Sequence, residues 1–458
     1  MANSRKPLHA EVTGAVRHSL QNHVGAADRL CVGLSGGLDS VVLLSALHVL
    51  ASEFRLKLSA LHVNHQLHPE ADRWEAFCRE YCRRLGVPCA VERVSVVRSG
   101  GESLEAVARA QRYAAFFQQP ADFVVLAHHR EDQAETVLIQ LLRGAGLQGL
   151  RAMPETRVPG GPSAGWPRLL RPLLQVSRAA LREYAGVYGL SWVEDPSNRE
   201  THHARNYLRH ELLPVLALRF PSWATTLGRS ARHLAEAGEL LDQLAEADFA
   251  ACREGAGIRI TAALGLGQSR AVNLLRWWVR ERGAPPFHQK QLEDWLRQSQ
   301  ARADRNPNLL WAGWTLARFK GCWQLDPTLT AEWPELFFER WPQGDSILIP
   351  GGGTLRLRRI QDGGVRLALL SAGGFFLRRR RGGERLRLFA GGGSRTLRNL
   401  LQEAGIPPWR RDAMPLLFHG NDLVCVPGVA VDVAARAGPG EAGLAMLWEP
   451  FASDAAQQ

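Results

Sequence analysis

A six-residue stretch rich in serine and glycine, residues 35–40, constrains the fold of this chain more than any other part. The apolar run before it, residues 29–34, has the length of a strand, and the apolar run after it, residues 41–48, reads as a buried helix. A loop between a strand and a helix N-terminus directs backbone N–H groups and the positive end of the helix dipole to one point. Glycines let an anion approach that backbone closely. The stretch therefore predicts a phosphate-binding loop, with a plain strand-to-helix turn as the alternative.

The loop lacks the marks of two common phosphate-binding fingerprints. No lysine follows the glycines, as a Walker A loop requires, and the G-x-G-x-x-G spacing of dinucleotide-binding folds is missing. The string instead resembles the loop of the N-type ATP pyrophosphatases (PP-loop enzymes), which cleave ATP to AMP and pyrophosphate. That resemblance implies that Asp39 meets Mg²⁺, an ion that prefers carboxylate, phosphate and water oxygens. It implies an ATP-binding set of Ser35, Gly36, Gly37, Leu38, Asp39 and Ser40.

Strand-like and helix-like runs alternate up to residue 127, and most of the strand-like runs are apolar. A Rossmann-like parallel sheet with helices on both faces buries such strands most economically, so the fold class is α/β. In these sheets ligands bind beyond the carboxyl ends of the strands. Three stretches leave those ends: the loop at Ser35, the turn with His62 and His65, and residues 128–136.

The third of these stretches opens a helix with several acidic side chains. Acidic residues in a first helical turn are favourable for the helix dipole alone, which is the structural reading. However, Asp132 and Glu135 are three residues apart, share a face and lie close to His129. A cluster of this kind holds a metal, a lysine ammonium or a proton in transit.

Five motifs, all within the first 209 residues and in the right order, resemble the tRNA(Ile)-lysidine synthetases of the PP-loop superfamily. Besides the loop, they are His62-Val63-Asn64-His65, residues 106–113, residues 128–136 with 142–150, and residues 194–198 with Arg205-Asn206 and Arg209. The family usually carries two aspartates where this chain has Glu131-Asp132, so we carry the family's role to Asp132. Of the two adjacent histidines we carry it to His129 only.

The resemblance implies an ATP-dependent ligase. It would join L-lysine to C2 of the wobble cytidine of the CAU-anticodon isoleucine tRNA through an adenylated intermediate, releasing AMP and diphosphate and changing codon specificity from AUG to AUA. The implied catalytic residues are Asp39, His129, Asp132 and Glu135, and the implied substrate-binding residues are Arg112, Asn198 and Arg205. ATP, Mg²⁺, L-lysine and the tRNA are the expected ligands.

Composition shifts and the resemblance together predict three domains. We expect a PP-loop catalytic domain over residues 1–218, a small, mainly helical domain that orients the tRNA over 219–335, and a C-terminal α+β tRNA-binding domain over 345–458. The last contains the basic run 378–381, which is read either as a solvated loop or as a phosphate contact.

Charge and cysteine content bear on partners and compartment. The net charge of +11 and the isoelectric point of about 9.8 favour a polyanionic partner such as nucleic acid, or they simply aid solubility. The seven cysteines include no C-x-x-C pair, and an odd count fits a reducing cytoplasm. Cys78, Cys82 and Cys89 fit buried thiols better than a metal site. No signal core or membrane-length apolar run occurs, so we expect a cytoplasmic protein with no membrane contact and no obligate protein partner.

Three other readings remain open at this point. Another PP-loop enzyme such as a tRNA thiolase usually brings paired cysteines, which this sequence lacks. An amidotransferase-coupled synthetase needs a glutaminase domain, for which the residues before Asp28 are too few. A non-catalytic RNA-binding protein with a decayed nucleotide fold conflicts with the intact acidic residues Asp39, Asp132 and Glu135.

Overall fold

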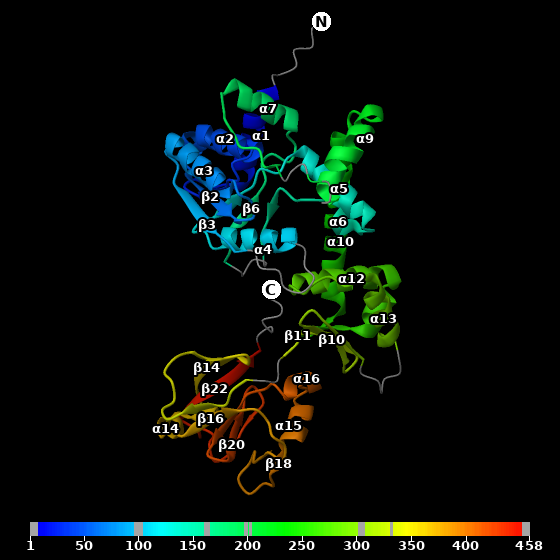
Figure 1. Cartoon of the computed structure of the whole chain (residues 1–458). Coiled ribbons are helices and arrows are strands. Elements are labelled where there is room, and N and C mark those ends of the chain that lie inside the picture. Colours follow the sequence, from blue (N-terminus) through cyan, green and yellow to red (C-terminus); the bar gives the residue numbers. More distant parts are fainter. Residues whose placement is uncertain are drawn as a thin grey trace. The chain divides into compact units, whose positions relative to one another are not determined.

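The computed structural model describes residues 8–95, 104–159, 165–196, 200, 204–300, 307–329 and 333–450. The chain divides into two compact units, Met1–Leu241 and Asp242–Gln458 (Figure 1). The candidate loop at Ser35 and the acidic cluster both lie in the first unit. We describe each unit by itself.

A six-stranded sheet forms the centre of the first unit, in the spatial order β3-β2-β1-β4-β6-β5. All its neighbouring strands pair in parallel except β5, which is antiparallel to β6 at one edge. The strands are β1 (Arg29–Gly33), β2 (Lys57–Asn64), β3 (Cys89–Arg93), β4 (Phe123–Val125), β5 (Thr156–Arg157) and β6 (Arg168–Leu170). The predicted parallel sheet is therefore confirmed, with one antiparallel edge strand added.

The two faces of this sheet are buried by different helices, because successive strand residues point to opposite sides. Leu30 and Val32 of β1 belong to a core with side chains of α1, α2, α3 and α7, whereas Cys31 belongs to a smaller core with Phe116 of α4. Figure 1 shows α1, α2 and α7 on one side of the strands and α4 on the other. The covering helices are α1 (Leu8–His23), α2 (Leu38–Phe54), α3 (Ala71–Leu85), α4 (Leu104–Phe117) and α7 (Arg178–Val187).

The order of the strands determines where a ligand can approach the sheet. The chain runs outward from β1 through β2 to β3, then returns to the other side of β1 to form β4 and β6. The order in which strands are added to the sheet therefore reverses between β1 and β4. Open α/β sheets bind ligands at such a position. The loop at Ser35 follows β1 and the histidine pair His128-His129 follows β4, so both leave the sheet at this point.

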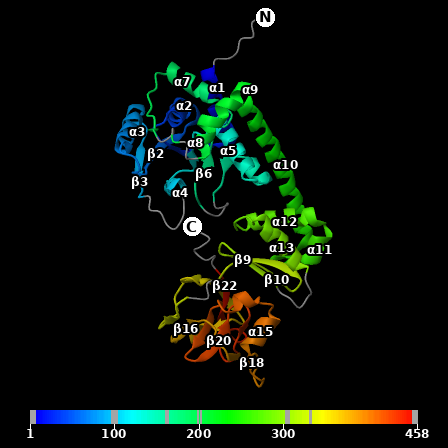
Figure 2. The same cartoon turned by 45° about the vertical axis from the view of Figure 1, so that its right-hand side comes forward.

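The helices after β4 complete the first unit. They are α5 (Arg130–Leu142), α6 (Leu147–Leu150), α8 (Ala204–Tyr207), the π-helical turn η2 (Leu208–Leu212) and α9 (Leu213–Arg219). The next helix, α10 (Trp223–Cys252), has 30 residues and continues into the second unit (Figure 2). At about 1.5 Å per residue, such a helix is on the order of 45 Å long.

The first part of the second unit has a core in which helices pack on an antiparallel sheet. Trp278 and Trp295 of the helices and Trp323 of the sheet are all buried in it. Its elements are α11 (Ile260–Gly265), α12 (Gln268–Glu281) and α13 (Gln289–Ser299), with the strands β7 (Arg253–Glu254), β8 (Gly257–Arg259), β9 (Asn308–Trp311), β10 (Trp314–Phe319) and β11 (Cys322–Pro327). The helices expected here are present, and the strands β7 and β8, which the sequence did not indicate, extend the sheet.

The rest of the second unit is an α+β arrangement of antiparallel sheets around one apolar core. One sheet contains β12 (Leu336–Phe338), β16 (Phe375–Arg378), β19 (Leu416–His419), β20 (Asp422–Val426) and β21 (Ala430–Val431). A second contains β13 (Ser346–Ile349), β14 (Gly353–Gln361), β22 (Ala442–Glu449) and β15 (Val365–Arg366), and β17 (Arg385–Leu386) pairs with β18 (Arg395–Thr396). The helices are α14 (Leu367–Ser371), α15 (Leu397–Glu403) and α16 (Pro408–Arg411). The predicted α+β class of this region is confirmed.

All seven cysteines are free thiols, and six of them are buried. No group of three histidine, cysteine or acidic side chains in the described ranges is arranged to hold a metal ion, so Cys78, Cys82 and Cys89 form no such site. None of the described helices is long and apolar enough to cross a membrane.

The end of β1 leaves no room for a side chain at Gly33. A Cβ atom there would lie 2.8 Å from Phe116 Cζ and 2.9 Å from Leu126 Cδ2. We therefore expect Gly33→Ala to lower the free energy of unfolding by about 1–3 kcal/mol, the usual cost of overpacking a core. Hydrogen exchange of peptides from β1 and α4 measures this loss.

Gly186→Ala is the matched control, because Gly186 lies in α7 and no described atom is within 4 Å of an added Cβ. Alanine is the better helix former, so this variant should be as stable as the original or up to about 1 kcal/mol more stable. Equal protection in both variants would show that β1 and α4 do not pack as described.

Candidate active site

The loop after β1 presents its backbone to solvent at the start of α2. The Ser35 hydroxyl accepts a hydrogen bond from Gly37 N–H at 3.3 Å and lies 3.2 Å from the Ser40 hydroxyl, which donates to Gly37 O at 2.9 Å. No side chain caps the first N–H groups of α2. These donors and the helix dipole are consequently available to an anion, as the sequence predicted for a phosphate-binding loop.

Gly36 must be glycine for two reasons. Its φ of +85° lies in the left-handed region, which residues other than glycine adopt only at an energetic cost. A Cβ atom would also lie 2.9 Å from Val193 Cγ2 and 3.2 Å from Cys78 Sγ. The carbonyl of Gly36 accepts a hydrogen bond from Val193 N–H at 3.0 Å, so the segment after α7 fixes the position of the loop.

The base of the loop is held by His62 from the neighbouring strand β2. His62 Nδ1 lies 2.9 Å from Leu34 O, and because a carbonyl only accepts, Nδ1 must carry the proton. Burial lowers the pKa of His62 below its ordinary value, which keeps the ring neutral. The first histidine of the motif at residues 62–65 therefore positions the loop.

The acidic cluster is built at the N-terminus of α5. His129 is the N-cap residue, and its N–H donates to Asp132 Oδ2 at 3.0 Å, so this carboxylate satisfies one of the free donors of the helix end. Burial alone would raise the pKa of Asp132, but the charge of His129 and this hydrogen bond lower it below its ordinary value. Asp132 thus has both roles that the sequence left open, helix capping and membership of the cluster.

His129 lies at the centre of three carboxylates. Its Nδ1 is 3.1 Å from Glu131 Oε2, and its Nε2 is 3.7 Å from Asp39 Oδ2 and 3.5 Å from Asp132 Oδ2. Burial acts to lower the pKa of His129, but the nearby carboxylates of Glu131, Asp132 and Asp39 outweigh it and raise the pKa. The ring links the loop of β1 to the helix after β4, because it lies within ion-pair distance of Asp39 and Asp132.

Asp39 fits the role of a cation ligand. Its Oδ1 atom is buried without a hydrogen-bond partner in the described structure. Burial raises the pKa of Asp39, and the charge of His129 opposes that rise. A hard cation such as Mg²⁺, which prefers oxygen ligands, would provide this oxygen atom with a partner beside the phosphate-binding loop.

Glu135 is almost fully buried, at 1% exposure, and pairs with arginines from the segment around η2. Arg209 Nε and Nη2 each donate to one of its oxygens at 2.8 Å, and Nη2 also lies 3.3 Å from Asp132 Oδ1. Arg205 Nε lies 3.5 Å from Glu135 Oε2 and its Nη2 donates to Thr136 Oγ1 at 3.0 Å. Burial raises the pKa of Glu135 although Arg209 opposes the rise.

A cavity of about 240 Å³ opens beside this cluster within the first unit. Its lining combines polar and charged side chains with apolar ones: His129, Glu131, Glu135, Arg178 and Arg209 together with Leu213, Pro214, Ala217 and Trp223. A ligand with an aliphatic stem and a charged end matches a lining of this mixed composition.

The structure brings together Asp39, His129, Asp132, Glu135 and Arg205 among the residues selected from the sequence. Arg112, on α4, lies beside His65 at the end of β2; burial and the charge of Arg112 lower the pKa of His65 to about 4. Asn198 lies outside the described residues.

Two residues of the site were not selected from the sequence. Glu131 was set aside because the family usually has aspartate there, yet its carboxylate contacts His129 and accepts a hydrogen bond from Arg178 N–H at 3.0 Å. Arg209 received no role, although its position four residues after Arg205 would have placed both on one face of a helix.

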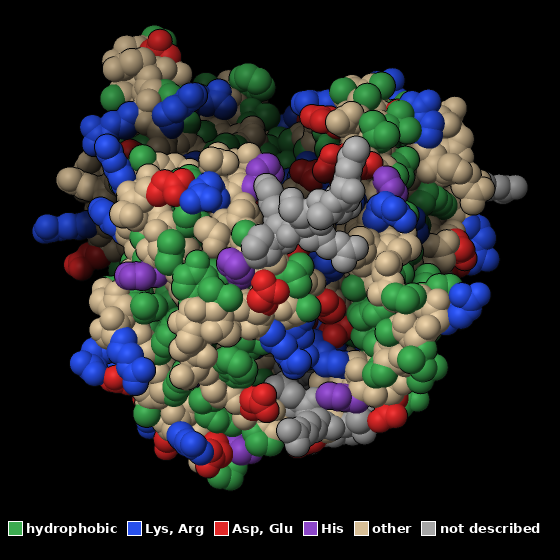
Figure 3. Space-filling model, turned by 90° about the horizontal axis from the view of Figure 1, so that it is seen from above, with side chains coloured by type: hydrophobic (Ala, Val, Ile, Leu, Met, Phe, Trp, Pro, Cys, Tyr) green, Lys and Arg blue, Asp and Glu red, His purple; other side chains and the backbone are tan. Residues whose placement is uncertain are grey.

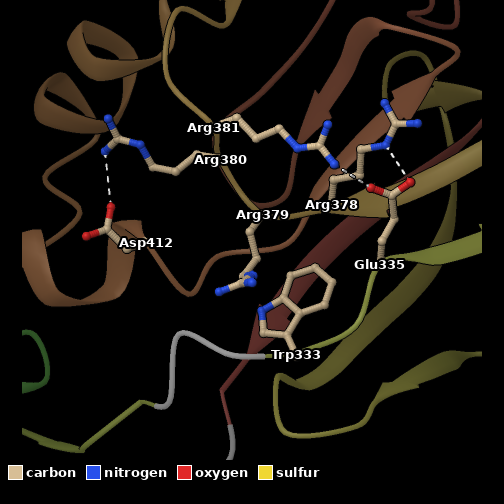
Figure 4. Close-up of a pocket in the computed structure, with 7 residues that line it drawn as sticks. All are labelled: Trp333, Glu335, Arg378, Arg379, Arg380, Arg381 and Asp412. Atoms are coloured by element: carbon tan, nitrogen blue, oxygen red, sulfur yellow. Dashed lines mark hydrogen bonds and ion pairs between the residues drawn. The ribbon is translucent and has the colours of Figure 1, made fainter.

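A second candidate site lies in the C-terminal part of the second unit. Four consecutive arginines, residues 378–381, line a cavity of about 340 Å³ together with Trp333, Glu335 and Asp412 (Figure 4). Glu335 pairs with Arg378 at 2.9 Å and with Arg381 at 3.0 Å, and Asp412 pairs with Arg380 at 3.5 Å.

Arg379 is different from its neighbours in this cavity. No described carboxylate lies within ion-pair distance of it, and Figure 4 shows it beside the Trp333 indole. Four cations against two carboxylates leave the lining positive, so the cavity suits a phosphate.

On the face drawn in Figure 3, lysine and arginine side chains are interspersed with acidic and apolar side chains and form no single continuous basic patch.

Three family models match this chain. A PP-loop domain matches residues 10–216, a TilS substrate binding domain matches residues 259–323, and a TilS substrate C-terminal domain matches residues 375–448. The first contains the loop after β1 and the acidic cluster, and the last contains the arginine-lined cavity wall.

Similar proteins agree with these models. The chain is 38% identical over 455 residues to the tRNA(Ile)-lysidine synthase of Nitrosomonas europaea, covering 98% of each chain. It is 42% identical over 421 residues to that of Alkalilimnicola ehrlichii, covering 91% of this chain and 93% of the other. Among solved structures, the U34-tRNA thiolase NcsA from Methanococcus maripaludis matches with 16% identity and a TM-score of 0.42, over 50% of this chain and 80% of that one. A likeness this weak does not support a thiolase function. Matches of this identity over nearly the full length show that the chain belongs to the tRNA(Ile)-lysidine synthase family.

Proposed function

We propose that the cavity beside His129 binds L-lysine and that the loop at Ser35 binds ATP, with the residue roles set out below. The protein is an ATP-dependent ligase of the tRNA(Ile)-lysidine synthase family, and tRNA(Ile) is its macromolecular substrate. The reaction joins lysine to C2 of the wobble cytidine of the CAU-anticodon tRNA and releases AMP and diphosphate. The tRNA and ATP substrates support a cytoplasmic location.

The composition of the cavity lining is the observation that carries the lysine assignment. Lysine has a four-carbon stem that an apolar wall can cover and an ammonium that needs a carboxylate. The lining contains Leu213, Pro214 and Trp223 as well as the carboxylates of Glu131 and Glu135. His129, which also lines the cavity, lies 3.7 Å from Asp39 of the ATP loop, so the amine would be held next to the activated base.

The loop and α2 would hold the phosphates of ATP by backbone N–H groups and by the hydroxyls of Ser35 and Ser40. Asp39, with its unsatisfied buried oxygen, would hold Mg²⁺. When bound, Mg²⁺ neutralises charge that develops on the leaving diphosphate.

Two steps follow from this arrangement. The cytosine C2 carbonyl oxygen attacks the α-phosphorus of ATP and expels diphosphate, which converts a poor leaving group into a good one. The side-chain amine of lysine then attacks C2, and AMP departs. Because an ammonium cannot attack, and the ordinary pKa of lysine is about 10.4, a carboxylate must take its proton. Glu135 is our candidate for this base, since burial raises its pKa.

The remaining polar residues would bind the tRNA. Arg205 faces the cluster from α8, and Arg112 lies near the end of β2, so both can contact the cytidine or its phosphates. By family resemblance Asn198 joins them. We assign the arginine-lined cavity of the second unit to a more distant part of the tRNA.

Release of labelled diphosphate from ATP, measured with and without tRNA and lysine, tests the function as a whole. We expect release that depends on the CAU-anticodon tRNA and lysidine formation that depends on lysine. Release with no lysine incorporated would indicate a different modification, and no release would indicate a binding protein.

Glu135→Gln tests the assignment of the base. We expect adenylate formation to change by less than about tenfold and lysine transfer to fall by about 10²–10⁴-fold, the usual worth of a general base. Rapid-quench measurement of the two half-reactions separates these effects.

Glu183→Gln is the control, because this glutamate is partly exposed and pairs with His9 instead of the cluster. It should leave both half-reactions unchanged. If lysine transfer is also unchanged in Glu135→Gln, Glu135 is not the base.

Arg379→Ala tests the RNA contact in the second unit. Removing one phosphate contact should weaken tRNA binding and reduce the slope of log K against log salt by about one. Arg358→Ala, on the exposed side of β14, is the matched control and should leave both quantities unchanged. An unchanged slope in Arg379→Ala would remove this arginine from the tRNA interface.

A further inference from the structure

The carboxylate proposed to receive lysine is already occupied in the structure. Arg209 Nε and Nη2 donate to both oxygens of Glu135 at 2.8 Å, a bidentate arrangement that leaves no oxygen without a strong donor. Nη2 reaches Asp132 at 3.3 Å as well. A lysine ammonium and the Arg209 guanidinium would have to share one buried carboxylate.

Arg209 and Arg205 already lie at this carboxylate, so a lysine ammonium would be repelled by both unless it displaced one of them. Glu135 is 1% exposed, and removing Arg209 without replacement would leave this buried carboxylate only Arg205, at 3.5 Å, which is unfavourable because a buried charge needs close partners. Replacement of one cation by another keeps the charge balanced. The ammonium of lysine carries the same charge as the guanidinium it would displace and also donates hydrogen bonds.

Arg209 is placed where such an exchange is feasible. It lies on η2, a π-helical turn, and such turns are frequent at functional sites. The side chain of Arg209 is 23% exposed, whereas that of Glu135 is 1% exposed, so the arginine has a route to solvent and the carboxylate does not. Arg209 also lines the cavity proposed for lysine.

We propose that Arg209 occupies, in the free enzyme, the position of the substrate's ammonium, and that lysine binds Glu135 only after Arg209 has moved to a phosphate group. This inference rests on the proposed lysine site and adds an order of binding to it. The enzyme then keeps lysine out until a phosphate-bearing substrate is present, which couples the two halves of the reaction.

The phosphate can come from the nucleotide or from the tRNA. Arg209 interacts electrostatically with Asp39, which lies beside the nucleotide loop. Arg205, a proposed tRNA contact, lies at the same carboxylate of Glu135 as Arg209. The shared chemistry is a phosphate that outcompetes Glu135 for the guanidinium. Separate addition of each ligand distinguishes the two sources.

Equilibrium dialysis of labelled lysine with the full-length protein tests the proposal without any variant. We expect weak binding to the free protein and binding at least about tenfold tighter when a non-cleavable ATP analogue, the tRNA or both are present. The ligand that produces the gain is the source of the phosphate. Equal affinity with and without these ligands would overturn the proposal.

Arg209→Met removes the cation but keeps most of the side-chain volume. The free variant should bind lysine at least about fivefold more tightly than the original protein, and the gain from ATP analogue and tRNA should fall to about twofold or less. Arg209→Gln, which keeps a hydrogen-bond donor for Glu135, should behave in the same way and serves if the methionine variant is unstable.

Arg178→Met is the matched control. Arg178 lines the same cavity, but it contacts Glu131 through its backbone N–H and forms no ion pair with Glu135 among the described residues. It should keep the dependence of lysine binding on the other ligands. Weaker lysine binding in Arg209→Met, with the dependence intact, would make Arg209 a permanent structural partner. No lysine binding to the original protein under any condition would instead contradict the proposed function.

Discussion

The parallel pairing of β1 with β2 on one side and β4 on the other is the constraint on which the site depends. It directs the carboxyl ends of these strands to one edge, so the loop of β1 and the histidine pair after β4 meet there although they are about ninety residues apart. Helices α2 and α5 then begin at this edge, and both N-termini face the same region. One anion-binding helix end and one acidic helix end are thereby neighbours.

Charge balance governs what this edge can do. Buried Asp132 and Glu135 are compensated by His129, Arg205 and Arg209, so the free site holds few unpaired charges. Asp39 Oδ1 is the described exception at the loop. An unpaired buried charge is costly, so we expect each substrate either to satisfy such a group or to replace one of the cations.

Much of the fold was predictable because local patterns and the global arrangement agree. The apolar runs around residues 30, 60 and 124 are strands of one sheet, and the helix expected after His129 begins at Arg130. The short strands β5, β7 and β8 were not predictable, since two or three residues carry no periodicity and are held by their partners.

The sequence by itself determined the chemistry that the chain carries. Residues 35–40 required a tight, anion-binding turn, and the acidic residues after His129 required a cation or a proton nearby. Tertiary structure alone decided how these groups are paired. It brought Arg209 to Glu135 and Glu131 to His129, because contacts between residues far apart in the chain depend on the packing of whole helices. Local spacing cannot encode that packing, so the partners of these carboxylates became visible only in the folded molecule.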